Sequence, residues 1–286
     1  MRIGITTDME GVAGVNTFDA WTMPGGYFYE IGKELLTDEV NAAVRGFLEN
    51  GFDEAIIFDA HGHGGVDIRK LDERVLYQRG FAGPYPVGIT PECDALAWVG
   101  QHAKAGTPCA HLAHTSSVYV RDQRINGVSV GEFGMGVYMA ATMDPAPVPI
   151  FGSGDEAFCK EAKALCPHIH TVCVKQGQIP GSGDECTGPE YRVRNEAAVH
   201  ISPKLACRKI YEEACAAAQD FMKSPDNFRI APLPAPYTVE IDYRTDYHGE
   251  VVHKVYRHES DLIAAMNLTW ADPDRKQTEK AKLKDN

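Results

Sequence analysis

Residues 2–11 read Arg-Ile-Gly-Ile-Thr-Thr-Asp-Met-Glu-Gly and open the chain with a short β-type run that stops at two carboxylates. In extended backbone, residues two positions apart face the same side, so Asp8 and Glu10 can point at one place. Two carboxylates held that close disfavour each other's charge unless a cation lies between them. The alternative interpretation is that both acids only cap a following helix, and the rest of the chain decides between the two.

Strand-like and helix-like segments alternate after this first strand. Further buried strands are predicted at residues 54–59, 94–100, 148–152 and 170–175. Apolar residues at helical spacing predict helices at residues 31–50, 132–143, 155–166 and 202–221. This order favours an α/β fold, a three-layer α/β/α architecture with a largely parallel sheet.

The composition changes after Pro225, where three prolines between residues 232 and 236 indicate an extended linker. A strand at 237–243 and a possible partner at 251–256 come next, followed by a short helix at 260–266 and a polar, charged tail predicted to be frayed. We therefore expect an α/β metal-binding catalytic domain at 1–227 and a smaller C-terminal α+β unit at 228–286.

The overall composition excludes several classes of protein. The net charge of -12 argues against nucleic acid or an anionic membrane as the main partner. No apolar run approaches the ~20 residues needed to cross a bilayer, and the N-terminus lacks a signal-peptide pattern. The eight cysteines are scattered without a CxxC pair, which fits reduced thiols better than a disulfide framework. We expect a cytoplasmic globular protein.

Metal-ligand residue types also follow the other predicted strands. His61 follows the strand at 54–59, His102 follows the strand at 94–100, and Glu132 begins a predicted helix. A lone histidine at such a place is more often structural, but ligands in open α/β sheets bind at the carboxyl ends of the strands, where these residues would meet Asp8. Mixed imidazole and carboxylate donors suit Zn²⁺, with Mn²⁺, Co²⁺ or Fe²⁺ as alternatives. The pattern indicates a catalytic metal site.

Five short motifs resemble the D-aminopeptidase DppA family, the dinuclear zinc peptidases of peptidase family M55. The motifs are Asp8-Met9-Glu10-Gly11, Asp59-Ala60-His61, Gly100-Gln101-His102-Ala103-Lys104-Ala105, His114 and Val130-Gly131-Glu132. The resemblance runs to about residue 175, and more weakly to about residue 270. It implies that two zinc ions are held by Asp8, Glu10, His61, His102 and Glu132, with Asp8 bridging them.

The same resemblance implies an activity and an assembly. The expected activity is hydrolysis of short peptides, with an N-terminal D-amino acid such as D-Ala, and the expected assembly is a homodecamer. His114 is implied as the catalytic residue, described in the family as a nucleophile or a base. We favour an acid/base or oxyanion role for His114, because metal-activated water already supplies a nucleophile.

Two other classes of function stay open at this point. Another dinuclear metallohydrolase could act on L-peptides, other amides or phosphoesters, although no Arg, Lys or Asn set for phosphate is evident near the motifs. A non-catalytic protein that binds peptides, or is associated with their transport, could instead hold a structural metal.

Some neighbouring residues have two interpretations. His63 could reach the same side as His61, but the glycines around it make its path uncertain. His111 and His114 compete for one family position because the spacing differs by one residue, and His114 fits better. Asp155 or Glu156 could bind a substrate ammonium group, although helix N-capping is the more common role. Residues 177–188 are predicted to form a glycine-rich surface loop.

Overall fold

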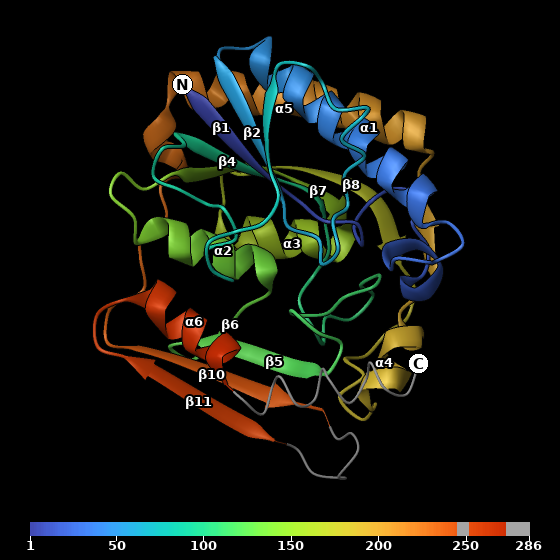
Figure 1. Cartoon of the computed structure of the whole chain (residues 1–286), viewed down its shortest axis with the longest axis vertical. Coiled ribbons are helices and arrows are strands. Elements are labelled where there is room, and N and C mark those ends of the chain that lie inside the picture. The colour runs from blue at the N-terminus through green and yellow to red at the C-terminus, as the bar shows by residue number, and fades with distance from the viewer. Residues whose placement is uncertain (245–251, 273–286) are drawn as a thin grey trace.

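A seven-stranded sheet forms the centre of the computed structural model, which describes residues 1–244 and 252–272 (Figure 1). The strand order is β3-β2-β1-β4-β7-β8-β9, and every neighbouring pair is parallel except β8 and β9. The strands are β1 (Arg2–Thr7), β2 (Glu54–Asp59), β3 (Val75–Gln78), β4 (Ala95–Gln101), β7 (Val148–Asp155), β8 (His170–Gly177) and β9 (Ala198–His200). The predicted parallel sheet is confirmed, and β1 lies near its middle.

Helices cover both faces of this sheet, as Figure 1 shows. One face packs on α1 (Tyr29–Leu48) and α5 (Pro203–Lys223), and the other packs on α2 (Glu132–Ala141) and α3 (Glu156–Leu165). The alternation of side chains along the strands explains the two cores. Ile3 and Ile5 lie in the core under α1 and α5, whereas Trp98 lies in the core with α2 and α3. The predicted three-layer architecture is therefore confirmed.

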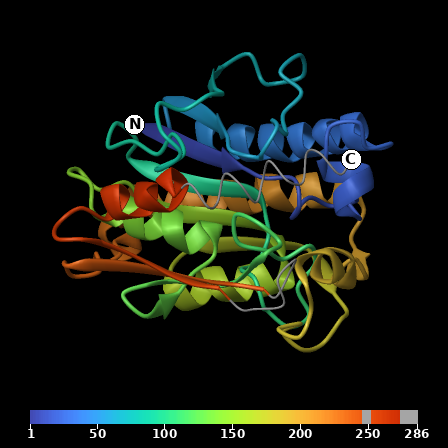
Figure 2. The same cartoon turned by 60° about the horizontal axis from the view of Figure 1, so that its bottom comes forward.

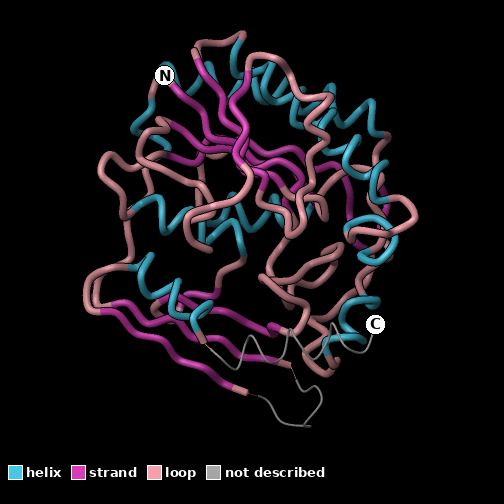
Figure 3. The backbone as a smooth tube through the Cα atoms, in the orientation of Figure 1, coloured by secondary structure: helices cyan, strands magenta, loops and turns pink. Residues whose placement is uncertain are grey.

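A second, antiparallel sheet lies beyond α2 and α3, as Figures 1 and 3 show. Its order is β11 (His253–His258), β10 (Tyr237–Tyr243), β5 (Val120–Ile125) and β6 (Val128–Ser129). Figure 2 shows α6 (Leu262–Ala271) lying along β10 and β11. Because β10 pairs with β5, this sheet takes strands from both sides of the division expected at residue 228.

The elements that the sequence did not predict are short. They are β3, β5, β6 and β9, a π-helical turn at Phe18–Thr22, a 3-10 turn at Pro225–Phe228 and α4 (Gly188–Arg194). The predicted loop at 177–188 is confirmed up to the start of α4. Residue 251 and residues 273–286, which include most of the predicted frayed tail, lie outside the described residues. Within the described part of the chain, no helix is long and apolar enough to span a membrane.

Candidate metal centre

Two groups of metal-donor side chains meet at the carboxyl edge of the parallel sheet. Asp8 and Glu10 follow β1 and join His61, which follows β2. The second group consists of His102 after β4, Glu132 at the first position of α2, and His114 from the loop before β5. Within each group, one donor atom per residue lies within 4.8 Å of the others. The structure thus brings together all five ligands expected from the sequence, and it places His114 beside them.

The first group surrounds the Nδ1 atom of His61. This atom lies 3.0 Å from Asp8 Oδ1 and 3.2 Å from Glu10 Oε2. His61 Nε2 is 2.8 Å from the carbonyl of Thr22, and a carbonyl only accepts, so Nε2 carries the proton. Without a proton on Nδ1, His61 directs a lone pair toward two carboxylates. Three acceptors around one point require a cation, which is either a proton on Nδ1 or a metal ion.

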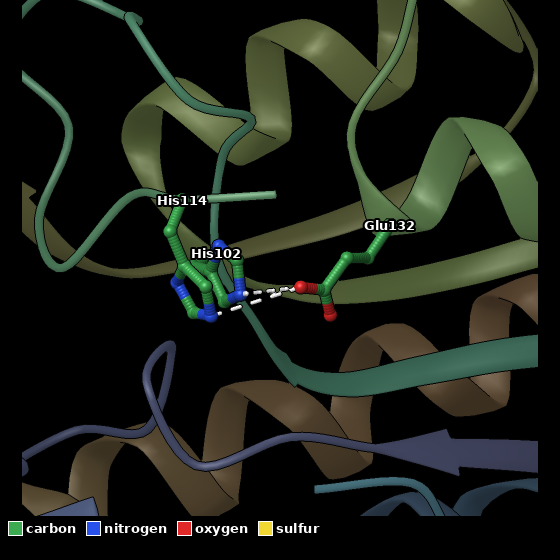
Figure 4. A group of neighbouring side chains, drawn as sticks. All are labelled: His102, His114 and Glu132. Atoms are coloured by element: carbon green, nitrogen blue, oxygen red, sulfur yellow. Dashed lines mark ion pairs between the residues drawn. The ribbon is translucent and has the colours of Figure 1, made fainter. Parts of the chain in front are cut away.

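The second group has a similar arrangement. His102 Nδ1 donates to the carbonyl of Ala103 at 2.9 Å, which leaves the Nε2 lone pair facing the site. Nε2 lies 3.2 Å from Asp8 Oδ2 and 3.8 Å from Glu132 Oε1. The rings of His102 and His114 stack at 4.1 Å, and Figure 4 shows both directed at the Glu132 carboxylate. Asp8 therefore offers one carboxylate oxygen to each group.

Two buried polar atoms without a hydrogen-bond partner in the described part of the chain show whether these residues suit a metal ion. Glu10 Oε2 and His102 Nε2 have no hydrogen-bond partner among the described residues, although both atoms are buried. Leaving such acceptors unpaired inside a protein is costly, so native structures satisfy almost all of them. Both are donor types that divalent zinc accepts. The donor set and its unpaired atoms therefore fit a metal ion in each group.

The two stacked histidines, His102 and His114, have pKa values that shift in opposite directions. Burial lowers the pKa of His102, but the adjacent carboxylate of Asp8 and the charge of Glu132 outweigh it and raise the pKa to about 10. Burial also lowers the pKa of His114, and here the charge of His102 adds to the effect. Burial raises the pKa of Asp8, yet the adjacent imidazoles of His102 and His61 bring it well below the ordinary value. Asp8 is thus an anion and His114 a neutral imidazole at neutral pH.

Close packing of the β1 and β4 ends sets this geometry. Gly11 N–H donates to the Gly100 carbonyl at 2.7 Å. Gly100 has a φ of 76°, and a Cβ atom there would lie 2.0 Å from the backbone oxygen of Asp8, so only glycine fits. The neighbouring Gln101 Nε2 donates to Asp8 Oδ2 at 3.2 Å. Gln101 thereby helps orient the carboxylate shared by the two groups, a role that the sequence did not reveal.

The segment at residues 11–16, which follows Glu10, is held by buried polar side chains from distant elements. Glu39 of α1 accepts the Ala13 N–H at 2.9 Å, and Lys175 of β8 donates to the Val15 carbonyl at 3.1 Å. Further contacts to this segment come from His200 Nδ1 and His111 Nε2. No sequence motif marks these residues, because their roles depend on contacts between segments far apart in the chain.

The donor groups open into a cavity of about 820 Å³. Asp8, Glu10, His61, His114 and Glu132 line one part of it. The rest is largely apolar, with side chains from the segment at residues 81–89, from α2 and from α6; they include Phe81, Tyr85, Val87, Ile89, Met135, Met139 and Trp270. Arg79 and Arg192 also line the cavity. The sequence predicted none of these walls.

The structure also decides between the two interpretations that the sequence left for His111, His63 and Asp155. His111 is fully buried and contacts the carbonyls of Asn16 and Glu196, so of the two competing histidines only His114 lies in the donor groups. His63 is exposed at the cavity and belongs to neither group. Asp155 is the N-cap of α3 and accepts the Phe158 N–H at 3.0 Å, which confirms the capping interpretation.

Glu156 also has a structural contact. It forms an ion pair with Lys160 at 3.0 Å, and neither Glu156 nor Asp155 is among the residues that line the cavity within the described ranges. A role of either carboxylate in binding a substrate ammonium group is therefore not supported.

Comparison with known proteins identifies the family of this chain and agrees with its fold. The family model for D-aminopeptidases, peptidase M55, matches residues 1–274. A D-aminopeptidase of Bacillus subtilis (strain 168) is 30% identical over 192 residues, which are 66% of this chain and 68% of that protein. The solved structure of the Zn-dependent D-aminopeptidase DppA from Bacillus subtilis, described as a self-compartmentalizing protease, has the same fold. It matches with a TM-score of 0.78 and 22% identity over 94% of this chain and 96% of that chain. This chain belongs to the D-aminopeptidase family, peptidase M55.

Proposed function

We propose that this chain is a zinc-dependent aminopeptidase that removes an N-terminal D-amino acid, such as D-Ala, from short peptides. Membership of the family makes the chain a metal-dependent aminopeptidase. The observation that carries the proposal is the convergence of Asp8, Glu10, His61, His102 and Glu132 with two buried acceptors left unpaired among the described residues. We propose zinc as the metal because the related DppA is Zn-dependent and the donors are imidazole and carboxylate.

Each proposed ligand has a defined place. Glu10 and His61 would hold one ion, His102 and Glu132 the other, and Asp8 would contribute one carboxylate oxygen to each. When bound, a pair of such ions polarises a carbonyl group and lowers the pKa of water toward ~7. The Thr22 and Ala103 carbonyls fix the tautomers of His61 and His102, so the correct nitrogen faces the site.

His114 is placed to move a proton. Its Nδ1 donates to the Leu112 carbonyl at 3.1 Å, which leaves a lone pair on Nε2, and this atom lies 3.7 Å from Glu132 Oε1. Its lowered pKa keeps the imidazole neutral at neutral pH, as a general base requires. We propose that Nε2 accepts a proton from the attacking water and returns it to the leaving amine.

The cavity favours a peptide over a phosphoester. A phosphoesterase needs several cationic or amide groups around the phosphate, as the general use of Arg and Lys for phosphate shows. Of the residues that line the cavity in the described part of the chain, only Arg79 and Arg192 are permanent cations. Arg79 is already used, because it donates to the carbonyls of Asp59, His61 and Gly62. The large apolar wall suits a peptide side chain instead.

We also propose that copies of this chain assemble into a homo-oligomer, with the homodecamer as the expected state. The related DppA is a self-compartmentalizing protease, which supports an assembly of several copies. Light scattering coupled to size-exclusion chromatography measures the mass directly. We expect the mass of ten chains of 31.4 kDa; the mass of one or two chains would rule out the decamer.

Matched dipeptides test the proposed activity. Zinc-loaded enzyme should hydrolyse D-Ala-D-Ala faster than L-Ala-L-Ala, and a chelator should abolish turnover that added zinc then restores. Metal analysis of the same preparation should give two ions per chain. Turnover of the L-isomer alone would contradict the proposed D-specificity but leave the aminopeptidase activity supported. Turnover of neither isomer by fully zinc-loaded protein would contradict the proposal as a whole.

A further inference from the structure

Arg192 lies on α4, the short helix at the lower right of Figure 1, and its side chain lines the cavity. Its guanidinium lies over the ring of Phe18, with Cζ 5.3 Å from the ring centroid. Phe18 in turn contacts His114 edge-to-face, with ring centroids 5.4 Å apart. Two ring contacts therefore connect a permanent cation to the proposed general base.

Arg192 is the available cation of this cavity. Arg79, the other permanent cation among the described lining residues, is committed to backbone carbonyls. Arg192 pairs with Asp19, and both donating nitrogens, Nε and Nη2, use the same carboxylate oxygen. Within the described residues, no hydrogen bond uses Nη1 of Arg192. One side of the guanidinium is therefore open to a further acceptor.

The ion pair between Asp19 and Arg192 is weak enough for another carboxylate to replace Asp19. The Asp19 side chain is 76% exposed and the Arg192 side chain 28% exposed, so water screens their attraction. Glu196 also acts on Arg192 electrostatically, but its carboxylate accepts the Phe18 N–H. A substrate carboxylate can thus join or replace Asp19 at the guanidinium, whose planar fork binds carboxylates with two parallel hydrogen bonds.

Arg192 lines the same cavity as His114, within reach of a short peptide bound at the donor groups. An extended chain spans at most about 3.3–3.6 Å per residue, so the free carboxylate of a di- or tripeptide lies about one or two residues beyond the bond that is cut. Arg192 Cζ lies 5.3 Å from the Phe18 ring and that ring lies 5.4 Å from the His114 ring, so the guanidinium is no farther from His114 than these two distances together. The C-terminal carboxylate of a longer peptide lies farther from the bond that is cut.

We propose that Arg192 binds the C-terminal carboxylate of di- and tripeptide substrates and so makes the enzyme select short peptides. The inference rests on the proposed aminopeptidase activity and adds the group that recognises substrate length. It predicts that the charge at the far end of the substrate, rather than its side chains alone, determines binding.

The test compares D-Ala-D-Ala with D-Ala-D-alaninamide, which lacks the carboxylate charge. Zinc-loaded wild-type enzyme should prefer the free acid in kcat/KM by about 10- to 100-fold, the range for one charge-assisted hydrogen bond, and mostly through KM. In Arg192→Gln this preference should fall to within about 2-fold, because kcat/KM for the free acid falls far more than kcat/KM for the amide. Arg192→Lys should keep part of the preference, because it retains the charge but loses the fork.

Asp19→Asn is the matched control, since it removes the competing carboxylate and leaves Arg192 in place. The preference for the free acid should persist or increase in this variant. Equal rates for acid and amide in wild type would overturn the inference while leaving the aminopeptidase intact. An equal loss for both substrates in Arg192→Gln would do the same, because it would show a structural role through Phe18. Turnover of neither substrate by wild type would instead contradict the proposed function itself.

Discussion

His102 and His114 are chemically identical side chains with stacked rings, and their surroundings give them opposite protonation behaviour. Both are buried, which lowers the pKa of each imidazole. Only His102 also lies directly against the Asp8 carboxylate, which raises its pKa to about 10, and the resulting positive charge lowers the pKa of His114 further. A metal ion in place of the proton on His102 has the same electrostatic effect. The pair thus provides one ligand and one neutral base.

The variant His114→Ala tests this division of roles. We expect turnover of D-Ala-D-Ala to fall by about 10²- to 10⁴-fold, the usual contribution of a general base, while metal content stays at the wild-type value. Inductively coupled plasma mass spectrometry and steady-state kinetics on the same sample provide both readings. Loss of one ion per chain would show that His114 is a ligand of the second group.

Glu39 is a second residue whose behaviour depends on burial. Burial raises its pKa to about 8 from an ordinary value of 4.5. Between these two pH values the unfolded chain binds fewer protons at this position than the folded chain, so the free energy of unfolding falls as pH rises. The maximal slope for one group is about 1.4 kcal/mol per pH unit. Glu39 therefore destabilises the fold toward pH 8.

Glu39→Gln should remove this dependence and still accept the Ala13 N–H through its amide oxygen. We expect the difference in Tm between variant and wild type to become more positive from pH 5 to pH 8, by several degrees at about 2–4 °C per kcal/mol. Thermal unfolding at both pH values gives this difference, in which titrations common to both proteins cancel. A difference that is constant with pH would mean that Glu39 is ionised throughout this range.

At the scale of elements, the site depends on how closely β1 and β4 approach at their carboxyl ends. The backbone of Asp8 lies against Gly100, where a Cβ atom would be 2.0 Å from the Asp8 oxygen. A substitution at this position must therefore move the strand end that carries Asp8 or the one that carries His102. Such a substitution therefore disturbs the proposed ligands of both ions at once, although it replaces none of these ligand residues.

Gly100→Ala is expected to lower both metal content and Tm, with a loss of at least about 2 kcal/mol from the clash and from the positive φ. Gly62→Ala is the matched control, because a Cβ atom there has no neighbour within 4 Å among the described residues. Calorimetry and metal analysis compare the two variants. Equal stability of Gly100→Ala and Gly62→Ala would contradict the tight packing of the strand ends.

At the scale of the whole molecule, one core joins segments from both sides of residue 228. Val120, Ile125 and Met135 pack in the same cluster as Val239 and Met266. Strand β10 pairs with β5, and Trp270 of α6 reaches the cavity that contains the donor groups. The C-terminal strands and helix therefore complete both a sheet and the wall of the site.

Removal of residues 228–286 should consequently prevent residues 1–227 from folding as a stable unit. The truncation exposes the apolar side chains of β5 and α2, and we expect loss of cooperative thermal unfolding and increased binding of an apolar dye. Circular dichroism and dye fluorescence measure these effects against the full chain. A truncated protein that unfolds cooperatively and binds zinc would instead support the two domains expected from the sequence.

The sequence predicts those elements whose signal is local. The strands at 54–59 and 237–243 have the predicted bounds, because each is a compact run of apolar or alternating residues. Strand β5 has the sequence Val-Arg-Asp-Gln-Arg-Ile and reads as polar. Its pairing with β10 arises from a segment more than a hundred residues away, which no local pattern contains.

The sequence by itself determined the longer strands and helices of the parallel sheet, in order, and the donor residues at the strand ends, since periodicity and the rule for parallel sheets depend only on neighbours along the chain. The tertiary structure decided which tautomer each histidine adopts, which of His111 and His114 reaches the site, and that Arg192 faces it. These features are contacts between segments far apart in sequence. Their strength depends on burial and distance, and only the folded chain defines both.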